Sequence, residues 1–216
     1  MKKNNNQSNN ANNGTTSASD LNQKPQSAQK NAITYLHDLV YLLAGILLVL
    51  LLLFRVVIVS GPSMNDTLLN GDYLILLNNV FYSNPKQGDI IVASKDSFKD
   101  GEPIIKRVIA TEGQFVDIDF NAGIVFVGDS LDTMMPLSEE YTKTLTTRQE
   151  GMEFPLQVDE GCIFVMGDNR DMSKDSRNPE IGLVDTREVL GKAIFLILPG
   201  QDQITRSREY DRIGAL

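Results

Sequence analysis

A serine and a lysine, each in a constrained segment, are the residues of this 216-residue chain most able to carry out hydrolytic chemistry. Ser63 follows Gly61 and Pro62, which together favour a turn that can hold a serine hydroxyl exposed. Lys106 lies in the apolar segment Ile104–Ala110, where alternate residues of a strand share one face. Loss of solvation on such a face lowers the pKa of a lysine, which can then accept a proton from serine. Taken singly, each has a simpler reading as a turn serine and as a solvated or ion-paired lysine.

A third polar segment, Gly167–Arg177, follows an apolar run at Cys162–Met166. A calcium loop counted from Asp171 would need glycine and a terminal glutamate where this chain has Ser176 and Gly182, which excludes that reading. Alternating aspartate and arginine instead favour a loop that is paired with itself, since such hydrogen-bonded pairs hold a site rigid.

The single histidine and the charge distribution exclude several other kinds of site. With His37 as the only histidine, multi-histidine metal centres are excluded, and a Ser-His-Asp triad would have to use His37 itself. Residues 1–34 carry four lysines and one aspartate, whereas the remainder holds 16 basic and 27 acidic residues. An acidic body is a poor partner for nucleic-acid phosphates. We therefore expect no metal, no cofactor and no nucleic-acid partner.

A long apolar run follows a polar beginning. Residues 1–34 are rich in Asn, Gln and Ser and predict a disordered tail. Leu39–Val59 would span about 31 Å as a helix, which matches the hydrocarbon core of a bilayer, and we place an anchor at 35–59. A buried core helix would show a polar face. A cleavable signal peptide would need a shorter basic start and a small-residue cleavage site.

The charges beside the anchor predict its orientation. Lys24 and Lys30 precede it, and beyond Arg55 the next basic residue is Lys86. The positive-inside rule then places the tail in the cytoplasm and the rest of the chain outside the cell membrane. His37 would lie at the cytoplasmic face, so chemistry outside the membrane has to proceed without histidine.

The remainder, 60–216, predicts one mainly β catalytic domain of strongly bent antiparallel sheets. Short apolar segments separated by Gly, Asn, Asp and Pro are typical of strands. The expected strands are Tyr73–Leu77, Asp89–Ala93, Ile104–Ala110, Phe115–Asp119, Ile124–Val127, Cys162–Met166 and Ala193–Leu198. Asn121–Gly123 predicts a turn, and residues 128–160 predict an insertion or extended loop.

Four motifs resemble those of the bacterial type I signal peptidases. They are Ser63–Leu68, Gly88–Val92, Lys106–Ile109 and Gly167–Arg177, in the order of that family and behind an N-terminal anchor. The resemblance extends from about residue 36 to 200, and the last motif is the most specific.

The resemblance implies a membrane-bound serine endopeptidase that removes N-terminal signal peptides from secreted pre-proteins after small residues, so its partners would be these pre-proteins and the lipid bilayer. Ser63 would attack the peptide carbonyl and Lys106 would act as general base in an acyl-enzyme mechanism. The residues implied to support the site are Ser173, Asp175, Arg177, Asp168 and Arg170. Those implied to line the substrate pocket are Val57, Val59, Met64 and Ile105. The alternative is a non-catalytic relative that binds secreted or pilus-type subunits.

Two positions depart from the family pattern. Gly61 stands where some members have a serine that donates a hydrogen bond to the oxyanion, so a second donor has to come from elsewhere, such as Ser60. Asp66 stands where the family usually has proline, which affects the turn behind Ser63.

Overall fold

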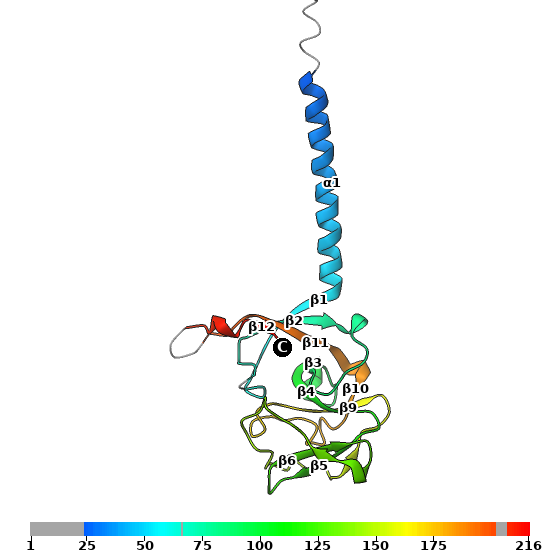
Figure 1. Ribbon diagram of the computed structural model, residues 1–216, viewed down its shortest axis with the longest axis vertical. Coiled ribbons are helices and arrows are strands. Elements are labelled where there is room, and N and C mark those ends of the chain that lie inside the picture. The colour runs from blue at the N-terminus through cyan, green and yellow to red at the C-terminus, as the bar shows by residue number, and fades with distance from the viewer. Residues whose placement is uncertain (1–23, 66, 202–206) are drawn as a thin grey trace, which may run out of the picture. The chain divides into compact units, whose positions relative to one another are not determined.

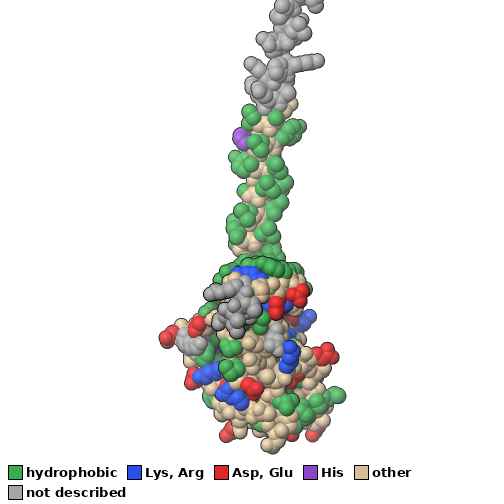
Figure 2. Space-filling view, turned by 90° about the vertical axis from the view of Figure 1, so that its left-hand side faces the viewer, with side chains coloured by type: hydrophobic (Ala, Val, Ile, Leu, Met, Phe, Trp, Pro, Cys, Tyr) green, Lys and Arg blue, Asp and Glu red, His purple; other side chains and the backbone are tan. Residues whose placement is uncertain are grey.

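A computed structural model describes residues 24–65, 67–201 and 207–216, and the chain divides into two compact parts, 1–48 and 49–216. Helix α1 (Lys24–Leu53) is the one helix of the described residues that is long and apolar enough to cross a membrane, through Asn31–Leu53. Hydrophobic side chains cover its surface (Figure 2), and none of that span is buried within the protein. These properties are consistent with a single membrane anchor.

The limits of α1 differ from those expected for the anchor and the tail. The helix begins at Lys24, so residues 24–34, which were expected to be disordered, form its first turns. The expected disorder of residues 1–23 lies outside the described residues. It ends at Leu53 rather than Val59, because β1 (Phe54–Ile58) pairs antiparallel with a neighbouring strand. Asn78 Nδ2 donates to the carbonyl of Leu52 at 3.2 Å, which satisfies one of the free carbonyls of the last turn.

Two antiparallel sheets form the framework of residues 49–216 (Figure 1). The eight-stranded sheet has the order β1-β2-β11-β3-β4-β9-β10, with β12 paired to β11, and the four-stranded sheet has the order β7-β6-β5-β8. The strands of the larger sheet, besides β1, are β2 (Tyr73–Asn78), β3 (Ile90–Ala93), β4 (Ile104–Thr111), β9 (Cys162–Met166), β10 (Val184–Asp185), β11 (Val189–Leu198) and β12 (Gly214–Ala215). Those of the smaller sheet are β5 (Phe115–Asp119), β6 (Ile124–Gly128), β7 (Met135–Pro136) and β8 (Leu156–Gln157). Short 3-10 helices are η1 (Asn79–Phe81), η2 (Lys99–Gly101), η3 (Leu131–Thr133), η4 (Thr186–Glu188) and η5 (Tyr210–Arg212).

The expectation of a mainly β architecture with curled antiparallel sheets and one N-terminal apolar helix is confirmed. Each of the seven expected strands is present: β5 and β9 have the expected limits, and the limits of the other five differ by one to four residues. The expected turn at Asn121–Gly123 joins β5 to β6, and Gly123 adopts a φ of 74° that favours glycine there. The sequence pattern did not predict five strands. One is β1, which continues the apolar run of the helix, and the other four, β7, β8, β10 and β12, have only two residues each.

The core of the larger sheet also fixes the turn that follows β1. Leu74 and Leu76, on alternate positions of β2, are buried against Val59 in one hydrophobic cluster. Met64 and Leu68 of the turn belong to the same cluster and are 1% and 0% exposed. Full burial of each such side chain contributes roughly 1.5–3 kcal/mol, so the segment that carries Ser63 is packed onto the sheet rather than projecting as a free loop.

Candidate active site

The hydroxyl of Ser63 and the amine of Lys106 lie in direct contact. Lys106 Nζ donates to Ser63 Oγ at 2.8 Å and to the carbonyl of Ile105 at 3.0 Å. Ser63 follows β1, whereas Lys106 lies on β4, and three strands separate β1 from β4 in the sheet order. Curling of the sheet therefore brings its distant strands together, and the two predicted residues meet.

Lys106 is held within the sheet rather than at its surface. Its side chain is 4% exposed, and Val108, two residues further along β4, is fully buried. Burial of this kind disfavours the charged form of an amine in general, and the lowered pKa of Lys106 stays a prediction. Pairing of β4 with β3 begins at Ile104, but pairing with β9 begins only at Arg107. Within the described residues, one edge of Ile104–Lys106 therefore carries no strand.

The loop after β9, Gly167–Arg177, is hydrogen-bonded to the backbone of the turn that carries Ser63. Asn169 N donates to Ser63 O at 3.1 Å, and its side-chain amide donates to the carbonyl of Pro62 at 3.2 Å. Gly167 lies so close that a Cβ built there would be 2.4 Å from Ser63 O and 2.2 Å from Ser173 Oγ. Only glycine fits at that position. Ser173 is 1% exposed, and its hydroxyl lies close enough to the carboxylate of Asp175 to help lower the pKa of that group, although it has no partner of ordinary hydrogen-bond geometry within the described residues. Its expected role in orienting Lys106 stays a prediction.

Asp175 and Arg177, in the second half of this loop, form a buried ion pair. Both side chains are fully buried, and the guanidinium donates to the two carboxylate oxygens at 2.8 and 2.9 Å. Burial alone would raise the pKa of Asp175, but the hydrogen bonds and charge of Arg177 outweigh it and lower that pKa. Asp175 also accepts from Gly167 N at 3.0 Å, which links the pair to the glycine beside Ser63.

Asp168 and Arg170 have partners outside their own loop, which differs from the expected self-paired loop. Arg107, next to Lys106 on β4, donates to the two oxygens of Asp168 at 2.8 and 2.7 Å. Thr67 Oγ1, from the turn that carries Ser63, donates to Asp168 Oδ2 at 2.6 Å. Asp168 therefore connects the strand of Lys106 with the turn of Ser63.

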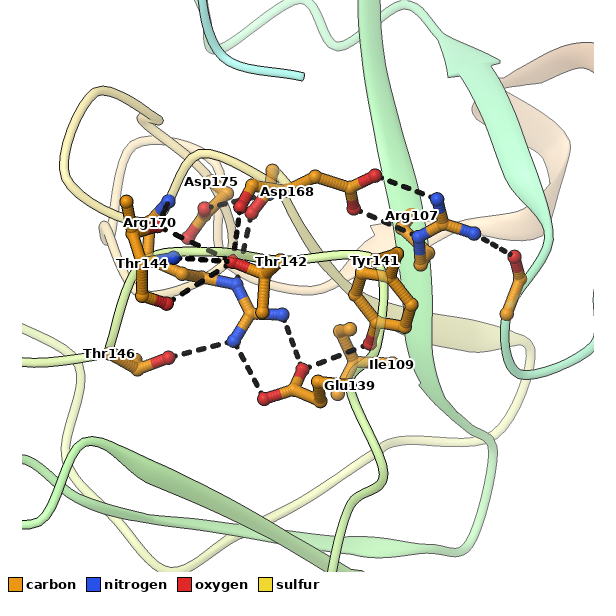
Figure 3. A network of polar contacts seen from close by, with 12 residues as sticks. Arg107, Ile109, Glu139, Tyr141, Thr142, Thr144, Thr146, Asp168, Arg170 and Asp175 are labelled. Carbon is orange, nitrogen blue, oxygen red and sulfur yellow. Dashed lines mark hydrogen bonds and ion pairs between the residues drawn. The ribbon is translucent and has the colours of Figure 1, made fainter. Parts of the chain in front are cut away.

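Arg170 is bound by the segment that the sequence predicted only as an insertion (Figure 3). Its guanidinium forms an ion pair with Glu139 and donates to Thr146 Oγ1 at 2.7 Å, and its side chain is 1% exposed. The pKa of Arg170 is raised because the hydrogen bond and charge of Glu139 outweigh its burial. Thr142 Oγ1 also donates to the carbonyl of Asp168 at 2.6 Å. The structure thus shows part of residues 128–160 as the outer support of the loop.

Tyr141 in the same segment lies between the two arginines. The guanidinium of Arg107 is 4.1 Å from the centre of its ring, and the hydroxyl donates to Glu139 at 2.9 Å (Figure 3). Burial and the neighbouring Glu139 carboxylate raise the pKa of Tyr141, so its hydroxyl remains a donor at neutral pH.

A groove of about 750 Å³ runs past the two central residues. Both Ser63 and Lys106 line it. The four residues predicted for the substrate pocket, Val57, Val59, Met64 and Ile105, also line it. Phe98, Glu102, Met172, Lys174 and Glu180 line it as well. The groove therefore has both apolar and charged side chains on its walls.

Several residues of the site were missed by the sequence analysis. Arg107 and Thr67 lie inside motifs that had been recognised, but no pattern paired either of them with Asp168. Glu139 and Tyr141 lie in a stretch without periodicity, where no signal reveals that Glu139 has a partner 31 residues away in the chain. Within the described residues, no group of three or more His, Cys, Asp or Glu side chains could hold a metal ion.

The family model described as signal peptidase, peptidase S26, matches residues 32–198. The chain belongs to this family. It is 35% identical over 168 residues to a probable signal peptidase I-1 of Synechocystis, covering 73% of this chain and 80% of that protein. It is 30% identical over 178 residues to signal peptidase I T of Bacillus subtilis, covering 81% and 91%. A crystal structure of a signal peptidase I from Enterococcus faecalis shares 29% identity and covers 50% of this chain and 96% of its own, with a TM-score of 0.40.

Proposed function

We propose that this protein is a membrane-bound serine endopeptidase that removes signal peptides from secreted pre-proteins, with Ser63 as nucleophile and Lys106 as general base. The observation that carries the proposal is the 2.8 Å contact between Ser63 Oγ and the buried Lys106 Nζ in a groove, within a chain of the signal peptidase family. The signal-peptide substrate is inferred from the names of its relatives.

The groove suggests how a substrate would bind. An extended peptide would add as a strand beside Ile104 and Ile105, on the side of β4 where pairing with β9 has not yet begun, and gain main-chain hydrogen bonds there. Val57, Val59 and Ile105 would enclose small side chains before the scissile bond, while the buried Met64 closes the floor. Large side chains would collide with these walls, which accounts for a preference for small residues.

The reaction would proceed in two halves. Ser63 Oγ attacks the peptide carbonyl while its proton passes to the neutral amine of Lys106, and a tetrahedral oxyanion forms. Among the described residues, no acceptor is bonded to the backbone N–H of Ser63, which can donate to that oxyanion, an interaction worth roughly 3 kcal/mol. The C–N bond then breaks, Lys106 returns the proton to the leaving amine, and an ester to Ser63 remains. In the second half, Lys106 takes a proton from water, and the hydroxide adds to the ester carbonyl. The C–O bond to Ser63 then breaks, the signal peptide leaves with a new terminal carboxyl group, and Lys106 returns the proton to Ser63 Oγ.

The anchor would place this site at the outer face of the cell membrane. α1 would cross the bilayer with the N-terminal tail in the cytoplasm, since Lys24 and Lys30 precede the apolar run. Translocated pre-proteins are held in the same membrane, and this shared confinement raises their effective concentration. Digestion of intact cells with an external protease tests the orientation, because residues 60–216 should be degraded while the tail is protected.

Cleavage by the full chain in detergent or liposomes tests the chemistry. A precursor with Ala-x-Ala before the cleavage site is incubated with the wild type, Ser63→Ala and Lys106→Ala, and with the matched controls Ser83→Ala and Lys86→Ala at exposed positions. We expect the first two variants to lose at least about 10³-fold in kcat and the controls to match the wild type. Equal processing by all proteins would refute the dyad. An inactive wild type that still binds the precursor would support the non-catalytic alternative.

A further inference from the structure

The segment that carries Ser63 is a loop closed at its own base. Val59 N donates to the carbonyl of Asp72 at 2.8 Å, and Gly71 N donates back to the carbonyl of Val59 at 2.9 Å. The position of the described residues between Val59 and Asp72, including Ser63, therefore depends on the contacts that hold Asp72 and the residues inside the loop in place.

Asp72 is fully buried and accepts hydrogen bonds from three separate segments. Leu69 N donates to Oδ2 at 2.7 Å and Gly200 N donates to Oδ1 at 2.7 Å. Arg212 donates to both oxygens, at 3.1 and 2.7 Å, in the bidentate geometry that gives an arginine–carboxylate pair its directionality. A residue near the C-terminus thus completes the base of the nucleophile loop.

Arg212 also reaches inside the loop. Its second guanidinium nitrogen donates to the carbonyl of Thr67 at 3.2 Å. The hydroxyl of Thr67 donates to Asp168, which Arg107 binds from the opposite side. Thr67 is therefore held from both sides, four residues after Ser63 in the chain.

The segment that carries Arg212 is itself fixed to the sheet. η5 (Tyr210–Arg212) leads directly into β12, which pairs with β11 through Phe195 and Ala215 and through Leu196 and Gly214. Leu216 N donates to the carbonyl of Ile194 at 3.2 Å. The side chain of Arg212 is only 17% exposed, so the contact is not a loose surface ion pair.

We propose that Arg212 is a positioning residue for Ser63, and that the segment from Tyr210 to Ala215 is part of the active-site scaffold rather than a structural tail. This inference rests on the proposed function. A purely structural pair would affect how much protein is folded without changing the turnover of the folded molecules. A positioning residue changes turnover, because small shifts of a nucleophile reduce its reactivity steeply.

Substitution of Arg212 tests this proposal on the full chain in detergent. Arg212→Gln and Arg212→Lys are compared with Arg187→Gln, a matched control whose guanidinium also binds a carboxylate bidentately but is 89% exposed. Circular dichroism and thermal melting report folding. Cleavage of a fluorogenic peptide with Ala-x-Ala reports kcat and KM.

We expect Arg212→Gln to lower kcat about tenfold or more, because the loop around Thr67 can then shift. KM should stay within about threefold, since Arg212 does not line the groove. Arg212→Lys, which keeps the charge but not the fork of donors, should give an intermediate kcat, and Arg187→Gln should match the wild type.

The proposal is wrong if folded Arg212→Gln turns over within about twofold of the wild type while losing only thermal stability. If Arg212→Gln does not fold, Arg212→Lys decides by the same criterion, because it retains an ion pair with Asp72. Failure of the proposed function has a different signature: the wild type itself would not cleave the peptide, and the inference about Arg212 would fall with it.

Discussion

Addition of a single methyl group at Gly167 should move Ser63, the proposed nucleophile, without changing either side chain of the proposed serine–lysine pair. In Gly167→Ala the new Cβ would lie 2.4 Å from Ser63 O and 2.2 Å from Ser173 Oγ. Rotation of the Ser173 hydroxyl cannot relieve this contact, because Ser173 Cβ would also lie 2.5 Å away, and the carbonyl of Ser63 belongs to the backbone. Separations below 3.0 Å essentially never occur for a real Cβ, so the two segments have to part by at least 0.6 Å.

The size of this shift sets the expected loss of activity. A displacement of about 1 Å can cost on the order of 10²-fold in rate, so we expect kcat/KM for an Ala-x-Ala peptide to fall roughly 30- to 100-fold. Overpacking should also lower the free energy of unfolding by about 1–3 kcal/mol. Both quantities are measured on the full chain in detergent, by peptide cleavage and by chemical denaturation.

Gly161→Ala is the matched control. Gly161 has a φ of 72°, so alanine is strained there, yet its added Cβ would meet no atom within 4 Å. The control should lose about 1 kcal/mol or more of stability and keep its full kcat/KM. The reasoning is refuted if folded Gly167→Ala keeps kcat/KM within threefold of the wild type, or if Gly161→Ala loses as much activity.

Three further outcomes follow from the geometry. Asp175→Asn leaves Arg177 buried without its charge partner and should lower the free energy of unfolding by about 3–5 kcal/mol at pH 7. Because the pKa of Asp175 is lowered in the folded protein, this difference from the wild type should persist above about pH 4 and shrink as the pH falls further. Chemical denaturation at a series of pH values measures it. Tyr141→Phe keeps the ring beneath Arg107 but loses the hydrogen bond to Glu139, and should cost about 1 kcal/mol in the same assay. EDTA should leave peptide cleavage unchanged, since the proposed chemistry needs only a serine and a lysine.

The elements that carry the site were readable from the sequence because each has a local signature. Alternation of apolar residues marked β4 and placed Lys106 on an apolar face, and glycine and proline marked the turn before Ser63. The end of the helix could not be read in the same way. Apart from Arg55, Phe54–Ile58 is as apolar as the helix before it, and only pairing with β2, a tertiary contact, converts it into a strand.

The partners of the loop after β9 could not be predicted for a related reason. The charges of the loop fit pairing among its own four residues, Asp168, Arg170, Asp175 and Arg177. Only Asp175 and Arg177 pair with each other, however, whereas Asp168 and Arg170 pair with residues outside the loop. The choice of partner depends on which distant segments the curled sheets bring near. Glu139 pairs with Arg170 across 31 residues of sequence, and no local pattern encodes such a contact.

The ion pairs around the site solve two problems that a serine–lysine pair faces without histidine. A lysine side chain is flexible, so its alignment has to come from burial and from rigid neighbours. An unpaired carboxylate nearby would stabilise the ammonium form and suppress its action as a base. Each carboxylate of the loop network, those of Asp168, Asp175 and Glu139, is bound by an arginine of its own. The network can therefore hold Ser63 and Lys106 in place while adding little net charge near the amine. A variant that removes one arginine should both increase the mobility of the loop and leave an unpaired carboxylate that makes Lys106 a poorer base.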